Sequence, residues 1–147
     1  MIEIQIKGLD EVLGKLAQWP EKVNGVMQTL MQASLMALWE HEPGYPPKPD
    51  GSTYDRTGTL GRTLGIEEGG GHAGQPDIFE VKPSGGFVEG HFGTRLGYAI
   101  YVIGQRQAWM HRGRWWTILD IATSAADEIR SLWQRGKDEI VAWFNGG

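Results

Sequence analysis

The residue types that could carry out acid–base, nucleophilic or metal chemistry are scattered along this sequence of 147 residues. It contains no cysteine, which excludes disulfide frameworks, thiolate zinc sites, iron–sulfur clusters and a cysteine nucleophile together. None of its serines lies in a G-x-S-x-G elbow, and none of its histidines belongs to an H-E-x-x-H pair. The four histidines are His41, His72, His91 and His111. We therefore expect no catalytic centre, no metal site and no cofactor.

One glycine-rich run, residues 69–74, formally matches the dinucleotide-binding pattern G-x-G-x-x-G. That function needs a preceding strand and a following helix whose amides bind the pyrophosphate. Here Glu67 and Glu68 come first, where they would repel phosphate, and Gln75-Pro76 follows in place of a helix. We interpret the run as a flexible hairpin tip, and the two glutamates as solvated charges at the end of a strand.

The most unusual stretch runs from residue 105 to residue 116, with three of the seven tryptophans, three arginines and no acid. Tryptophan, arginine and methionine are enriched at the centres of protein–protein interfaces. The same residues could instead cap the core below a C-terminal helix, or stack on a nucleic-acid strand. The interface candidates in this stretch are Arg106, Trp109, Arg112, Arg114 and Trp115.

Charge is unevenly distributed along the chain. Its net charge of −4 argues against extensive neutralisation of nucleic-acid phosphates. Between Glu89 and Asp120, however, there are four arginines and no acid, so the remainder carries −8. A local basic face is therefore compatible with an acidic whole.

The N-terminal part is predicted to be a strand followed by helix. Isoleucines alternate with polar residues over Ile2–Ile6, which is typical of a half-buried strand. Apolar residues recur at helical spacing over residues 9–16, and a longer helix then opens at Pro20 after a kink. It should end before Pro43. No basic region precedes an apolar core at the N-terminus, so we expect no signal peptide.

A proline-rich segment comes next. The four prolines between Glu42 and Thr53 exclude a continuing helix or a central strand. We expect an extended loop over residues 42–61, stiffened by polyproline-like geometry. Residues 54–64 are predicted to contain a turn or short helical piece that runs into a strand near Arg62–Glu67.

The middle of the chain is dominated by glycine, since thirteen of the 22 glycines lie between positions 58 and 104. This composition favours turns and short strands over helix. Residues 77–82 and 86–92 are strand candidates, joined as a hairpin by the turn Pro83–Gly86. Residues 98–103 form a more continuously apolar run, either a central strand or a short helix, which periodicity alone does not decide.

The C-terminal part is helical again. Thr117–Asp120 resembles a capping box, and apolar residues recur every three or four positions up to Phe144, with Gly136 expected to bend or end the helix. The order of elements predicts an α+β fold, in which an antiparallel sheet packs against an N-terminal kinked helix and a C-terminal helix. The length predicts a single domain over residues 1–147.

Three short motifs occur in order. They are Gly8–Leu13 (GLDEVL), Arg56–Thr63 (RTGTLGRT) and Tyr98–Gly104 (YAIYVIG). With the layout around them, they resemble the bacteriophage tail-completion family, also described as head–tail joining or neck components of long-tailed phages. The resemblance covers nearly the whole chain. Two features depart from it: Ile103 stands where an acidic residue is usual, and residues 111–116 stand where a proline and an apolar run are usual.

The resemblance implies a structural virion protein without enzymatic activity. It implies a homo-oligomeric ring, with six-fold symmetry expected, between the head connector and the tail tube. Head-connector or stopper proteins and tail-tube or terminator proteins would be its partners, DNA would only pass through the channel, and no membrane would be contacted. The chain would be made and assembled in the host bacterial cytoplasm and end in the virion neck. Four further interface candidates are Tyr54, Arg56, Thr57 and Leu60.

Other functions stay open at this stage. A minor tail or tail-terminator subunit of similar fold would show the same layout. A small nucleic-acid-binding module would bind heparin with a steep salt dependence. A metal-dependent hydrolase would require histidines and carboxylates from distant positions to converge in a pocket.

Overall fold

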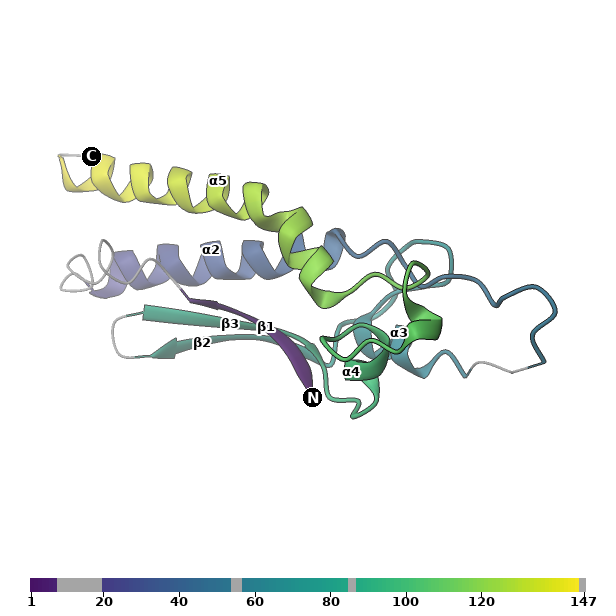
Figure 1. The fold of residues 1–147 in the computed structure, drawn as a ribbon. Coiled ribbons are helices and arrows are strands. Elements are labelled where there is room, and N and C mark those ends of the chain that lie inside the picture. Colours follow the sequence, from purple (N-terminus) through teal and green to yellow (C-terminus); the bar gives the residue numbers. More distant parts are fainter. Residues whose placement is uncertain (8–19, 54–56, 85–86, 146–147) are drawn as a thin grey trace.

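The structure is a computed structural model that describes the chain except for residues 8–19, 54–56, 85–86 and 146–147 (Figure 1). The predicted α+β class with an antiparallel sheet is confirmed. The helix predicted over residues 9–16 and the kink before Pro20 lie outside the described residues. In chain order the elements are β1 (Ile2–Lys7), α2 (Pro20–Glu40), α3 (Thr59–Leu64), β2 (Ile78–Ser84), β3 (Phe87–Thr94), α4 (Ala99–Val102), the 3-10 helix η1 (Trp109–His111) and α5 (Ile118–Phe144).

The sheet has the order β1-β3-β2, so β3 is its central strand and both pairings are antiparallel. Strands β2 and β3 form the predicted hairpin, in which Ser84 pairs with Phe87. Pro83 has no amide hydrogen to donate, and it belongs to the edge strand β2, where a missing donor disrupts pairing least.

Helices α2 and α5 cover one face of this sheet (Figure 1). Helix α2 packs on β3 and β2, while α5 packs along α2 and reaches β1. Apolar side chains of both helices meet Val88 and Phe92 of β3 in the core. Between the helices, the Trp133 indole donates a hydrogen bond of 2.9 Å to the Ser34 hydroxyl. Burying each large apolar side chain contributes about 1.5–3 kcal/mol, so the core fixes the helices on the sheet.

Helix α5 begins at the predicted capping box. The Asp120 amide donates to the Thr117 hydroxyl over 3.1 Å, and the Thr117 amide donates to the Asp120 carboxylate over 2.8 Å. The helix continues through Gly136, so this glycine does not end it. A Cβ atom at Gly136 would clash with Leu30 of α2. The glycine therefore allows the close approach of the two helices.

Two sequence predictions in the middle of the chain are wrong. Residues 62–67 do not form a strand, because Thr59–Leu64 form helix α3, which buries Leu60 and Leu64 one turn apart and ends at Gly65 with φ 69°. For the same reason the loop predicted over residues 42–61 is too long, since its last three residues belong to this helix. The run at residues 98–103, left open between strand and helix, contains helix α4.

The contact of α2 with β3 gives a stability prediction. A Cβ atom at Gly90 of β3 would lie 2.5 Å from the Met31 sulfur and 3.0 Å from Leu35 Cδ2, both fully buried side chains of α2. We expect Gly90→Ala to lower the free energy of unfolding by about 1–3 kcal/mol, as overpacked cores do. Urea denaturation measures this. Gly97→Ala is the matched control, because nothing lies within 4 Å of a Cβ there; equal effects of the two substitutions would contradict the packing.

Candidate docking groove

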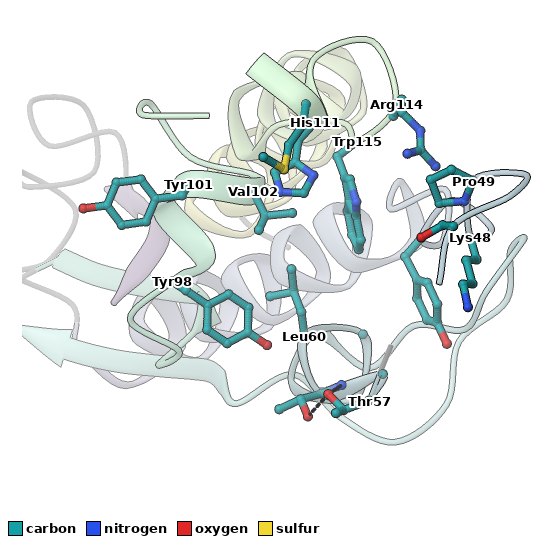
Figure 2. A pocket seen from close by; sticks show the side chains of 16 residues that line it. Lys48, Pro49, Thr57, Leu60, Tyr98, Tyr101, Val102, His111, Arg114 and Trp115 are labelled. Atoms are coloured by element: carbon teal, nitrogen blue, oxygen red, sulfur yellow. Dashed lines mark hydrogen bonds between the residues drawn. The ribbon is translucent and has the colours of Figure 1, made fainter. Parts of the chain in front are cut away.

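A surface groove of about 600 Å³ lies at the end of the molecule where α3, α4 and η1 meet (Figures 1 and 2). Four separate chain segments line it: the proline-rich segment over residues 42–53, the start of α3, helix α4 and the stretch over residues 105–116, which we call the basic–aromatic stretch. The lining residues are Tyr45, Lys48, Pro49, Ser52, Thr57, Gly58, Thr59, Leu60, Gly61, Tyr98, Tyr101, Val102, Met110, His111, Arg114 and Trp115. Segments far apart in the sequence thus form one surface.

The proline-rich wall is held by backbone carbonyl groups. The Trp116 indole donates a hydrogen bond of 2.7 Å to the Gly44 carbonyl, and the Arg114 guanidinium donates one of 3.0 Å to the Pro47 carbonyl. The Tyr45 amide donates to the Glu67 carbonyl over 3.1 Å. Hydrogen bonds therefore join the basic–aromatic stretch directly to the proline-rich segment.

The start of α3 forms the floor. Arg62 stiffens it by donating to the Thr57 carbonyl over 2.7 Å and to the Thr59 hydroxyl over 3.2 Å. Gly61 lies under the Tyr45 ring, and a Cβ atom there would come within 2.5 Å of that ring. Glycine at this position therefore lets the floor and the proline-rich wall touch.

Helix α4 forms the opposite wall. Ala99 and Ile103 are buried in the cluster below the groove, while Tyr98 and Tyr101 are about half exposed on its surface. The Ala108 amide donates to the Tyr101 carbonyl and the Ile118 amide to the Ile103 carbonyl, each over 2.7 Å. These bonds fix α4 against the segment leading into α5.

The basic–aromatic stretch divides into two parts. Trp115 and Trp116 pack against the buried cluster beneath the groove, and the Trp115 ring stacks on Tyr45 with centroids 6.0 Å apart and planes at 13°. These two side chains match the core-capping interpretation. Trp109, in contrast, is 79% exposed, and its neighbour Met110 is 53% exposed. Trp109 and Met110 are therefore large apolar side chains of this stretch that the core does not cover.

The predicted interface residues only partly converge. Thr57, Leu60, Arg114 and Trp115 line the groove, whereas the other three candidates of the basic–aromatic stretch are exposed outside its lining. Tyr54 and Arg56 lie outside the described residues. Four lining residues were not predicted individually from the sequence: Tyr45, Tyr98, Tyr101 and Met110. Tyrosines three positions apart share a helix face, which would have identified Tyr98 and Tyr101 had the run been read as helix.

Two histidines make polar clusters away from the groove. His41 lies 2.8 Å from the Ser124 hydroxyl through Nδ1 and 2.8 Å from the Glu128 carboxylate through Nε2. Nucleophilic catalysis by such a trio needs a substrate pocket and oxyanion donors, yet none of the three residues lines the groove. We interpret the trio as a structural contact that joins the end of α2 to α5. His91 lies between Glu3 and Glu89 on the sheet face opposite the helices, at 3.0 and 3.3 Å.

Neither a metal-ligand cluster nor a membrane-spanning helix occurs in the part of the chain that the structure describes. That part contains no group of three histidine, aspartate or glutamate side chains arranged to hold a metal ion. None of its helices combines the length and the apolar character needed to cross a membrane.

Comparisons with protein-family models, with curated proteins and with solved structures give no match to this chain.

A buried carboxyl group lies where the proline-rich wall leaves α2. Glu42 is 2% exposed, and neither of its carboxyl oxygens has a hydrogen-bond partner among the described residues. Burial disfavours the charged form and raises its pKa from 4.5 to about 9. Glu42 is therefore protonated in the folded protein at neutral pH, whereas it is ionised in the unfolded chain. The folded state is thereby destabilised relative to one with a side chain of the same size that is neutral in both states.

The raised pKa of Glu42 predicts an unusual pH dependence of the free energy of unfolding. Because its pKa is higher in the folded than in the unfolded chain, the folded state binds more protons between pH 4.5 and about 9. The free energy of unfolding should then fall as pH rises through that range, by up to about 1.4 kcal/mol per pH unit. We expect Glu42→Gln to remove this slope and to be the more stable form at pH 8. Parallel pH profiles of the two proteins in urea denaturation would contradict the assignment.

Proposed function

We propose that this protein is a structural subunit of a tailed-bacteriophage virion, a tail-completion or neck component that joins the tail tube to the head connector as a ring. The main support is that two of the motifs that resemble the family meet at one surface. The second motif supplies the groove floor through Thr57 and Leu60, and the third supplies a wall through Tyr98 and Tyr101. More than thirty residues separate these motifs in the sequence, so a common surface gives them a common role.

The residues around the groove have the composition of a protein interface. Trp109, Met110 and Tyr101 are each at least half exposed, and they belong to the residue types enriched at interface centres. Single exposed apolar side chains are ordinary, but a group of them beside a groove marks a contact surface. We propose that this surface contacts a neighbouring virion protein.

The competing functions have weaker support. A minor tail or tail-terminator subunit would use the same surface, so only its position in the particle separates it from a neck component. A nucleic-acid-binding module would need more cations than the two in the groove lining, Lys48 and Arg114, against a net chain charge of −4.

Deletion of the gene from a phage that carries it tests the proposed function. We expect electron microscopy to show DNA-filled heads and complete tails that fail to join, because a neck component acts after both are built. Tails of abnormal length would identify a tail-terminator or minor tail subunit instead. Infectious particles of normal appearance and titre would contradict every structural role in the virion.

Complementation of that deletion with variants tests the contact surface. Trp109→Ala removes a 79% exposed side chain, so we expect the free energy of unfolding to change by less than about 0.5 kcal/mol while the yield of joined particles falls at least about tenfold. Leu119→Ala is the matched control, because Leu119 is a similarly exposed apolar side chain, at 71%, that belongs to α5 and not to the basic–aromatic stretch. Equal yields from the two variants would remove Trp109 from the contact surface.

A further inference from the structure

The groove combines an apolar centre with a positive rim. Figure 2 shows Leu60, Val102 and Trp115 in its middle, with Lys48 and Arg114 toward one end. Among the residues that the structure describes, the groove lining contains no aspartate and no glutamate. In a chain whose net charge is −4, this surface is locally opposite in sign to the whole.

The apolar centre and the two cations of the groove each select a different feature of a ligand. An apolar side chain that enters between Leu60, Val102 and Trp115 removes apolar surface from water, which supplies affinity. The cations at the rim favour carboxylates next to that side chain and disfavour cations there, which supplies specificity. The ligand that satisfies both the apolar centre and the cations is a short chain segment with acidic residues next to an apolar anchor.

We propose that the groove binds a segment of a partner protein in which one aromatic or branched aliphatic side chain is flanked by aspartates or glutamates. The anchor enters the apolar centre over Leu60 and Val102. The flanking carboxylates face Lys48 and Arg114. This inference deepens the proposed function by naming the chemistry of the partner, and it rests on that function only for the place of the partner in the virion.

A single-stranded nucleic acid is the other polyanion that an aromatic, basic groove could bind, but the geometry favours a protein segment. Nucleic-acid strands bind through aromatic faces on which bases stack. The Trp115 and Tyr45 rings stack on each other, so each already covers one face of the other. Two of the three central side chains, Leu60 and Val102, are aliphatic, which suits a single inserted side chain better than a row of bases.

Selection from a random library of 12-residue peptides by mRNA display, with the full-length protein as the target, tests the proposal. We expect the recovered peptides to be enriched in aspartate and glutamate within three positions of a leucine, phenylalanine or tryptophan. Fluorescence anisotropy then measures the binding of one such peptide. Lys48→Glu and Arg114→Glu should each weaken it by at least about tenfold, as reversal of a contacting charge does. A peptide with lysines in place of its acids should recover binding to the Lys48→Glu/Arg114→Glu double variant.

Arg135→Glu is the matched control, because Arg135 is exposed on α5 and absent from the groove lining; it should leave the affinity unchanged. Circular dichroism of each variant shows that the fold is retained. Recovery of no peptides, recovery without acidic enrichment, or equal effects of Lys48→Glu and Arg135→Glu would overturn the proposal. Tighter binding of a twelve-nucleotide oligothymidylate, lost in the same groove variants, would replace the protein segment with a nucleic acid. The gene deletion reports on the virion role separately, so either idea can fail without the other.

Discussion

The Gly44 carbonyl group is the point on which the groove depends. It accepts the indole hydrogen of Trp116, and its residue has φ 80°, a conformation that side chains other than glycine rarely adopt. The backbone of Gly70 lies so close that a Cβ atom at Gly44 would clash with it. Trp116 and the turn at Gly70 thus hold this residue from two sides. The proline-rich segment that follows is thereby placed against the basic–aromatic stretch, and Tyr45 against Trp115.

The same constraint explains a feature that is unfavourable for stability. Glu42 is two residues before Gly44, and the path of the chain there buries its carboxyl group without a partner among the described residues. A protein selected for stability alone would have a neutral or apolar side chain at this position. The wall of the groove is therefore attached through a locally unfavourable segment, whereas the sheet with α2 and α5 is held by well-packed apolar clusters.

The fold could largely be predicted from local patterns, whereas the groove could not. The strand of alternating isoleucines, the β2–β3 hairpin and the capping box at Thr117 each depend on signals within a few residues, and each is found in the structure. A turn or short helical piece is expected within residues 54–64, but the strand predicted over residues 62–67 is helix α3 up to Leu64, because the buried pair Leu60 and Leu64 stabilises the helix through tertiary packing that local propensity does not report. The groove requires bonds such as Trp116 to Gly44, which join residues 72 positions apart. Spacing in the sequence carries no information about contacts at that range, so Tyr45 and Met110 were missed.

The central claim is that the proline-rich segment, the start of α3 and the basic–aromatic stretch meet in one groove. A NOESY spectrum of the isotope-labelled protein tests it most directly. The account predicts cross-peaks between the rings of Tyr45 and Trp115, whose centroids are 6.0 Å apart, and between the Leu60 methyl groups and the tryptophan rings of the same cluster. Absence of these cross-peaks in a spectrum that contains the β1–β3 and β2–β3 contacts of the sheet would show that the segments do not form the groove.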